Sequence, residues 1–256
     1  MKAIILAGGL GTRLREETEF RPKPMVEVGG RPVLWHIMKV LGAQGITDFV
    51  ICTGYKSEYI KNYFYNYGAS NLDFTITLGH QDSAVFHGSH DEFDWTVTVV
   101  DTGPLTPTGA RIKQIEKFVQ GERFFCTYGD GIADIDLQSL IDNHEHSGST
   151  ATMTTAKPNS RFGVVDIDEA GLVTSFREKP QGSELVNIGY FLFEPEIFQH
   201  LDDESMLEDR PLKSLAAIGE LNTNQHEGFW QPMDTFRESQ MLNDIWNSGQ
   251  APWKIW

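Results

Sequence analysis

The chain has 256 residues, of which 40% are hydrophobic, and a formal net charge of −15. This length and composition allow a large core, and the acidic balance argues against a nucleic-acid partner, which would require a basic face. No apolar run approaches a membrane span, and the N-terminal run is too short for a signal peptide and stops at Gly8. We therefore expect a cytoplasmic protein that does not contact a membrane.

Strand and helix patterns alternate through the first half of the chain. Apolar, β-branched or aromatic runs predict strands at residues 1–7, 49–52, 95–100 and 124–127. Apolar residues at helical spacing predict helices over residues 33–41, 59–67 and 112–119. The polar segment 78–93 is expected to be a loop. This alternation predicts an α/β fold with a mainly parallel sheet flanked by helices.

The second half changes character. Strand-like runs with short connections occur at residues 151–155, 163–167, 173–177 and 186–193, and we expect them to add antiparallel strands. Helices are expected around residues 212–218 and 236–246. Because no linker or repeat interrupts the chain, we expect one Rossmann-like domain over 1–256, with 1–135 and 136–256 as its two parts. Cys52 and Cys126 lie in apolar runs and are expected to be buried free thiols.

A glycine-rich segment, Gly8-Gly9-Leu10-Gly11-Thr12-Arg13, directly follows the first predicted strand. Its glycines allow positive φ angles and remove side chains that would keep a ligand away. Backbone amides in such a loop can face an anion, and Arg13 and Lys23 add positive charge suited to phosphates. The segment is neither a P-loop nor a complete Rossmann fingerprint, because Leu14 stands where the third glycine is required.

Several further motifs follow in a recognisable order. They are Pro22-Lys23-Pro24-Met25, Tyr128-Gly129-Asp130-Gly131, Glu178-Lys179-Pro180, Asn187-Ile188-Gly189 and Trp230-Gln231-Pro232-Met233-Asp234-Thr235. Together with the glycine segment, this set resembles the sugar-1-phosphate nucleotidylyltransferases over nearly the whole chain. Residues 100–103, 108–111, 228–235 and 251–254 favour the branch of that family that uses CTP and glucose 1-phosphate.

The resemblance implies a reaction and a cofactor. CTP and α-D-glucose 1-phosphate would give CDP-glucose and pyrophosphate, a step in nucleotide-sugar and O-antigen biosynthesis, with the sugar phosphate attacking the α-phosphorus in line. The nucleophile is already an anion, since the second pKa of a phosphate monoester is about 6, so no general base is needed. Catalysis would then consist of positioning and electrostatic stabilisation, with Mg²⁺ as the cofactor.

The resemblance also assigns site residues. The catalytic set is Arg13, Lys23, Asp130 and Asp234, of which Asp130 and Asp234 would hold the metal. The nucleotide would contact Leu6, Ala7, Gly8, Gly9, Leu10, Gly11, Thr12, Arg13, Lys23, Thr106, Arg111 and Gly129. The sugar phosphate would contact Gly131, Glu178, Lys179, Asn187 and Gly189, with Lys179 on its phosphate. The added antiparallel strands would form the wall of the sugar site.

Three assignments keep an alternative. Thr106 and Arg111 are candidates for contacting the cytosine base. The alternative for Arg111 is an arginine on a helix surface. Asp234 is either a metal ligand or the N-cap of the following helix, or both. Glu178 and Lys179, taken without the other motifs, form an ordinary exposed turn.

Alternatives to the whole function also stay open. UTP, dTTP or ATP, or another sugar 1-phosphate, would serve the same chemistry. A GT-A glycosyltransferase would use an Asp-x-Asp motif such as Asp134-Ile135-Asp136, although a helix cap explains that pair equally well. A regulatory paralogue would have lost charged members of the set, all of which are present. The family resemblance further implies a homo-oligomer, expected to be a hexamer, with residues 78–93 at its contacts.

Overall fold

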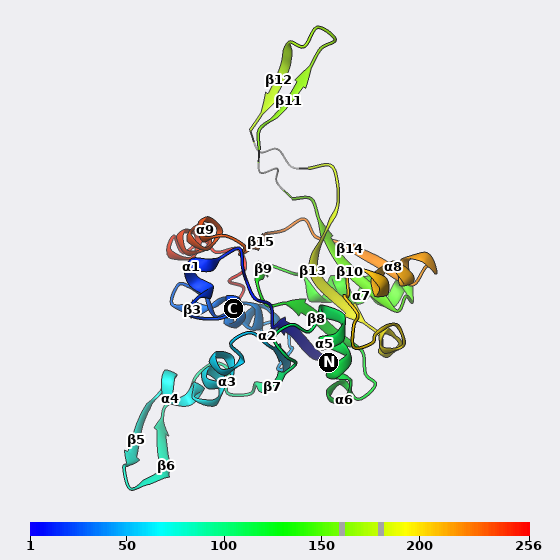
Figure 1. Ribbon diagram of the computed structural model, residues 1–256. Coiled ribbons are helices and arrows are strands. Elements are labelled where there is room, and N and C mark those ends of the chain that lie inside the picture. The colour runs from blue at the N-terminus through cyan, green and yellow to red at the C-terminus, as the bar shows by residue number, and fades with distance from the viewer. Residues whose placement is uncertain (159–161, 179–181) are drawn as a thin grey trace.

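A seven-stranded, mainly parallel sheet forms the centre of the protein in a computed structural model that describes residues 1–158, 162–178 and 182–256 (Figure 1). Its strand order is β14-β10-β13-β8-β1-β4-β7. The strands are β1 (Lys2–Ala7), β4 (Asp48–Thr53), β7 (Thr96–Asp101), β8 (Phe124–Tyr128), β10 (Ala151–Ala156), β13 (Val186–Phe193) and β14 (Leu221–Gln225). Within this sheet only β13 runs antiparallel to its neighbours.

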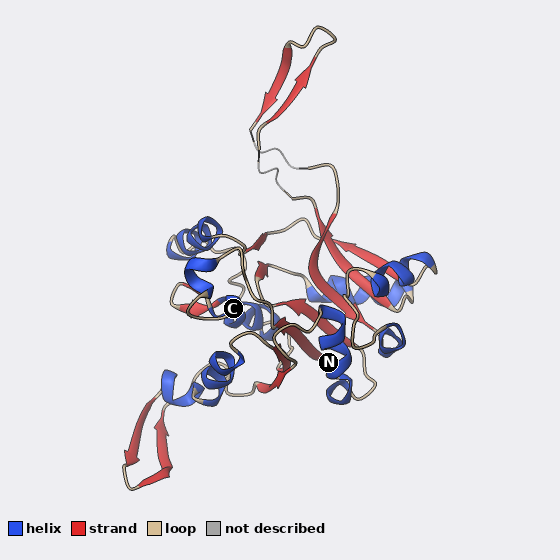
Figure 2. Cartoon of the chain, viewed as in Figure 1, coloured by secondary structure: helices blue, strands red, loops and turns tan. Residues whose placement is uncertain are grey.

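Helices cover both faces of this sheet (Figure 2). The helices in the described residues are α1 (Arg15–Thr18), α2 (Val33–Gly42), α3 (Ser57–Tyr65), α4 (Tyr67–Asn71), α5 (Thr108–Gln114), α6 (Glu116–Val119), α7 (Leu137–Ser147), α8 (Arg210–Ala217) and α9 (Phe236–Asn247), with 3-10 turns η1 (Lys23–Met25) and η2 (Pro195–His200). Alternate residues of β1 pack into two hydrophobic cores, one on each face of the sheet. Ala3 and Ile5 pack with α2, while Ile4 packs with α5 and η2. The predicted α/β architecture is confirmed.

Short strand pairs complete the fold. They are β2 (Glu27–Val28) with β3 (Arg31–Pro32), β5 (Asp73–Thr77) with β6 (His80–His87), β9 (Gly131–Ala133) with β15 (Trp230–Pro232), and β11 (Val164–Ile167) with β12 (Val173–Arg177). The hairpins β5–β6 and β11–β12 project from the body of the molecule (Figure 1). Strands from both sides of residue 135 share the central sheet.

Two sequence-based expectations need correction, and a third becomes more specific. Segment 78–93 is not all loop, because β6 pairs with β5 through Phe74–Phe86 and Thr75–Val85, and Val85 and Phe86 are apolar residues within this polar stretch. The helix expected over 112–119 is two short helices that separate at Ile115, where the backbone turns and keeps Ile112 and Val119 in the same core. The runs 163–167 and 173–177 form the expected antiparallel strands, as a separate hairpin outside the central sheet.

Candidate active site

Two adjoining cavities lie at the carboxyl edge of the parallel strands. The glycine-loop cavity has a volume of about 490 Å³. The β13 cavity, of about 300 Å³, opens beside it. Arg13, Tyr128 and Asp130 line both cavities, so two ligands bound there would meet at these residues. Ligands of open α/β sheets bind at this edge.

The glycine loop supplies the wall of the first cavity. The predicted residues that line it are Leu6, Ala7, Gly8, Gly9, Leu10, Gly11, Thr12, Arg13, Lys23, Thr106 and Arg111. Gly11 has φ of +62°, and a Cβ there would lie 2.8 Å from Thr18 Cγ2. Thr18 in turn donates its hydroxyl to Gly11 O at 3.1 Å and to Leu14 O at 2.9 Å. Glycine is therefore required where the loop turns back toward Lys23.

Arg111 lies beneath this loop and is 4% exposed. It donates from Nη1 to Thr53 O and Thr102 Oγ1, and from Nη2 to Gly8 O, at distances of 2.6 to 3.1 Å. A Cβ at Gly8 would lie 2.0 Å from Arg111 Nη1. The helix-surface interpretation of Arg111 is wrong, because the glycines leave space for a buried guanidinium. Burial lowers its pKa from the ordinary arginine value.

The pairing of β9 with β15 brings the two predicted metal carboxylates together. Gly131 pairs with Pro232, and Met233 N donates to Asp130 O at 2.9 Å. Asp130 precedes β9 and Asp234 follows β15, so both aspartates leave this short ladder at the same end. Residues 104 positions apart in the sequence thereby become neighbours.

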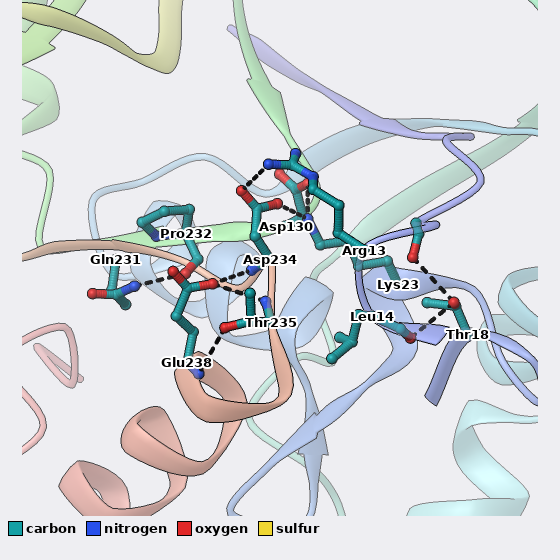
Figure 3. Close-up of polar contacts among 11 residues, drawn as sticks. Arg13, Leu14, Thr18, Lys23, Asp130, Gln231, Pro232, Asp234, Thr235 and Glu238 are labelled. Carbon is teal, nitrogen blue, oxygen red and sulfur yellow. Dashed lines mark hydrogen bonds and ion pairs between the residues drawn. The ribbon is translucent and has the colours of Figure 1, made fainter. Parts of the chain in front are cut away.

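Lys23 joins the two carboxylates, as Figure 3 shows. Its Nζ lies 2.6 Å from Asp130 Oδ2 and 2.6 Å from Asp234 Oδ1. Arg13 Nη1 lies 2.7 Å from Asp234 Oδ2, and the Arg13 side chain is 69% exposed. The four predicted catalytic residues therefore form one ion-pair cluster between the two cavities.

Asp234 does not cap the helix that follows it. Thr235 is the N-cap of α9, and its side chain accepts from Glu238 N at 3.3 Å. The Glu238 carboxylate accepts from the Asp234 and Thr235 amides at 2.8 Å each. This capping box satisfies the helix end, so the Asp234 carboxylate is available to the cluster.

The donor set fits a divalent cation. Mg²⁺ in nucleotide sites commonly takes one or two protein carboxylates and completes its shell with phosphate oxygens and water. Asp130 and Asp234 converge on one cation, the Lys23 ammonium. Among the described residues no group of three or more His, Cys, Asp or Glu side chains could hold a metal by itself. A metal at this site would therefore complete its shell with substrate phosphates and water.

The predicted sugar-phosphate residues divide into three groups. Gly131, Asn187 and Gly189 line the β13 cavity. Glu178 is exposed just after β12, at the base of a projecting hairpin, and is not among the residues that line this cavity. Lys179 lies outside the described residues, so its predicted contact stays a prediction.

Gly129 and Tyr128 differ from expectation in opposite ways. Gly129 is not among the lining residues; its amide donates to Leu6 O at 3.0 Å. Tyr128, which had no predicted role, lines both cavities, and its hydroxyl donates to the Glu208 carboxylate. Burial raises the pKa of Tyr128 above its ordinary value, so it stays a neutral donor. The sequence signal that could have identified Tyr128 as a cavity residue is its position at a strand end, directly before Gly129-Asp130.

In the Asp-x-Asp pair, Asp136 has a structural role and Asp134 lies beside a histidine. Asp136 is the N-cap of α7 and accepts from Ser139 N at 2.9 Å. Asp134 Oδ1 lies 3.1 Å from His226 Nε2. Cys52 and Cys126 are buried and free, as predicted, and burial raises the pKa of Cys52 to about 12.

Comparison with known proteins decides the family. The pattern of the family described as "Nucleotidyl transferase" matches residues 2–231. The chain belongs to this family. Glucose-1-phosphate cytidylyltransferase of Salmonella typhi is 49% identical to it, with all of both chains aligned. A probable glucose-1-phosphate cytidylyltransferase of Bacillus subtilis is 40% identical, again over the whole of both chains.

Solved structures of nucleotide-binding proteins share the family's fold. HddC from Yersinia pseudotuberculosis, complexed with GMP-PN, aligns with a TM-score of 0.70 at 22% identity, covering 96% of this chain and 99% of HddC. UTP-bound UGPase from Acinetobacter baumannii aligns with a TM-score of 0.68 at 17% identity, covering 96% and 92%. In the part of the chain that the structure describes, every helix is too short or too polar to span a bilayer.

Proposed function

We propose that this protein transfers the cytidylyl group of CTP to α-D-glucose 1-phosphate and releases CDP-glucose and pyrophosphate. The observation that carries this proposal is the 49% identity, over the full length of both chains, to glucose-1-phosphate cytidylyltransferase of Salmonella typhi. The site agrees with it, because two cavities that meet at a cluster of two cations and two carboxylates suit the joining of two phosphorylated substrates.

The glycine-loop cavity would hold CTP. Loop amides and the Arg13 and Lys23 cations would receive its triphosphate, and they supply positive charge locally within a protein of net charge −15. Thr106 lies in the wall of this cavity and remains our candidate for contacting the base. Arg111 supports the loop from below, and three of its N–H groups are already engaged by protein oxygens.

The β13 cavity would hold glucose 1-phosphate. Asn187 offers an amide to sugar hydroxyls, which both donate and accept, and Gly189 keeps the wall open. A Cβ at Gly189, whose φ is +83°, would lie 2.2 Å from Tyr128 Cδ2. We retain Glu178 and Lys179 as residues that contact the sugar phosphate, as the family resemblance implies.

The reaction follows from this placement. An oxygen of the sugar phosphate attacks the α-phosphorus of CTP, and the bond from that phosphorus to the β-phosphate bridging oxygen breaks. Arg13 and Lys23 stabilise the negative charge that develops on the departing pyrophosphate. Because the enzyme holds the sugar phosphate and CTP in line, their bimolecular reaction becomes effectively unimolecular.

Asp130 and Asp234 would hold Mg²⁺ against the substrate phosphates. When bound, the ion would supply further positive charge to the phosphates and fix their geometry. The residues fit this task because their carboxylates converge and because Thr235, not Asp234, caps α9.

We also propose that the protein is a cytoplasmic homo-oligomer, and a hexamer is the expectation. The projecting hairpin β5–β6 exposes Phe74, Val85 and Phe86, and Leu78 at its turn is 86% exposed. Apolar surface of this kind is typical of interfaces. Size-exclusion chromatography with light scattering should give about six times the chain mass of 28.9 kDa, whereas a monomer mass would contradict this expectation.

Pyrophosphate release with glucose 1-phosphate and a panel of nucleotides tests the function. CTP should be the best donor, and UTP, dTTP and ATP should be weaker. A tenfold advantage of dTTP or ATP over CTP, roughly 1.4 kcal/mol, would overturn the cytidylyl assignment. The same panel with galactose 1-phosphate and mannose 1-phosphate tests the sugar.

A further inference from the structure

The Lys23 ammonium lies between the two carboxylates that would hold the metal. Its Nζ is 2.6 Å from Asp130 Oδ2 and 2.6 Å from Asp234 Oδ1. The Lys23 side chain is 8% exposed, against 37% for Asp130 and 13% for Asp234. The ammonium that contacts both carboxylates is therefore the least exposed of the three groups, whereas the exposed Arg13 guanidinium contacts Asp234 alone.

Three separate segments hold this cluster together. Lys23 belongs to η1, where Pro22 and Pro24 restrict the backbone on either side. Asp130 and Asp234 are fixed by the β9–β15 ladder and by the capping box of α9. Two carboxylates that converge repel each other, and Lys23 is the protein cation that contacts both of them.

A dication shared by Asp130 and Asp234 would compete with the ammonium for the same oxygens. An ammonium and a dication at one point repel each other, so both cannot be held there. Lys23 also lines the glycine-loop cavity, where nucleotide phosphates offer alternative acceptors. Its flexible four-carbon stem allows the ammonium to move between the two sets of oxygens.

We propose that Lys23 is the built-in counter-cation of Asp130 and Asp234, and that it yields these carboxylates to a metal only when nucleotide phosphates take its ammonium. Metal binding and nucleotide binding are then coupled, and each tightens the other. The inference rests on the proposed metal-assisted transfer, so its test uses the protein in the absence of turnover.

Mn²⁺ binding to the protein without nucleotide tests this inference. The free-ion signal in electron paramagnetic resonance reports the unbound metal. Lys23→Met should bind Mn²⁺ more than about tenfold more tightly than the wild type, within the range usual for coupled sites. The double variant Lys23→Met, Asp130→Asn should lose this gain, because one of the two carboxylates is then neutral.

Arg13→Met is the matched control. Arg13 is also a cation on Asp234, at 2.7 Å, but it is 69% exposed and contacts only one of the two carboxylates. Removing an exposed partner of this kind should change Mn²⁺ affinity by less than about fivefold. An equal gain in Arg13→Met and Lys23→Met would mean that general charge, not the bridging position, sets the affinity, and would overturn the proposal.

Further outcomes are equally decisive. Lys23→Met that folds and binds Mn²⁺ no more tightly than the wild type contradicts the proposal. If circular dichroism shows that Lys23→Met is unfolded, Lys23→Gln, which keeps a neutral donor, takes its place. Lys23→Gln should bind Mn²⁺ more tightly than the wild type, by less than the tenfold expected for Lys23→Met. Unchanged Mn²⁺ affinity in Lys23→Gln would contradict the proposal. CDP-glucose synthesis by the wild type is measured separately. Its absence alongside a gain in Lys23→Met would reject the function alone.

Discussion

The guanidinium of Arg111 connects three segments that border the glycine-loop cavity. It bonds Gly8 O at the end of β1, Thr53 O at the end of β4 and Thr102 Oγ1 after β7. By holding the carbonyl of Gly8, it connects the start of the glycine loop to β4 and to the segment after β7. We therefore expect Arg111 to act by positioning the loop.

Arg111→Met should weaken both stability and CTP binding. Methionine keeps much of the length but removes three buried hydrogen bonds. Thr53 O keeps the Thr102 amide and Gly8 O keeps the Tyr55 amide, so only Thr102 Oγ1 loses its donor, and the expected cost is about 1–3 kcal/mol. Denaturant unfolding and a CTP titration measure the two effects. Arg111→Lys should recover part of each, since its ammonium can reach some of these oxygens. If Arg111→Lys instead altered the choice between CTP and UTP at unchanged stability, direct base reading would be the better account.

Residue patterns predicted part of this site. Gly8, Gly11 and Asp130 follow buried strands, so their place at one sheet edge could be inferred from the sequence. Arg111 could not be placed correctly, because its burial depends on space left by Gly8 and Gly54 from other strands. A Cβ at Gly54 would lie 2.7 Å from Arg111 Nη1.

At the scale of elements, the ladder β9–β15 and the first turn of α9 together position Asp234. The two strands have only three residues each, too few for a periodic pattern to predict. Thr235 followed three residues later by Glu238 is the sequence pattern of a capping box. The sequence alone did not decide whether Thr235 or Asp234 is the N-cap.

Thr235→Ala should destabilise the protein and reduce turnover. Loss of the N-cap hydroxyl costs about 1 kcal/mol of unfolding free energy and loosens the turn that carries Asp234. Urea unfolding and the turnover number measure these effects. Thr235→Ser, which keeps the hydroxyl, should remain close to the wild type. Equal losses in both variants would indicate packing of the Thr235 methyl group and not capping.

At the scale of the whole molecule, the C-terminal segment is fastened to α2 through His36. The imidazole donates from Nε2 to Val28 O at 2.8 Å, and Nδ1 accepts from Trp253 Nε1 at 3.3 Å. His36 and Trp253 are fully buried. This pairing requires the neutral ring, and burial lowers the pKa of His36 to about 4.

Stability should therefore fall in mild acid. The unfolded chain protonates His36 near pH 6.5, whereas the folded protein resists protonation down to about pH 4. The unfolded state gains protons first, so unfolding free energy declines as pH drops through this window, by about 2–3 kcal/mol for this group by pH 4.5. Urea unfolding at pH 7 and pH 4.5 measures the decline.

His36→Gln is the control for this prediction. Glutamine can both donate and accept but does not titrate, so the decline specific to His36 should disappear. Burial also lowers the pKa of His144, but that contribution is common to both proteins and cancels in the comparison. Equal declines in the wild type and His36→Gln would contradict the assignment.

The overall architecture could be predicted more fully than its edges. Buried parallel strands such as Ile4–Leu6 and Phe49–Cys52 carry a strong apolar signal, and they occupy interior positions of the sheet. The hairpins β5–β6 and β11–β12 project from that core (Figure 1). Their exposed residues are not constrained by core burial, so periodicity gave little guidance to their placement.

The most direct test of the proposed chemistry follows the α-phosphorus of CTP. With [α-³²P]CTP, glucose 1-phosphate and Mg²⁺, the label should enter CDP-glucose while unlabelled pyrophosphate is released. Asp130→Asn, shown by circular dichroism to be folded, should abolish this transfer. Label that never reaches the sugar nucleotide in the wild type, or transfer at the wild-type rate by Asp130→Asn in saturating Mg²⁺, would contradict the account.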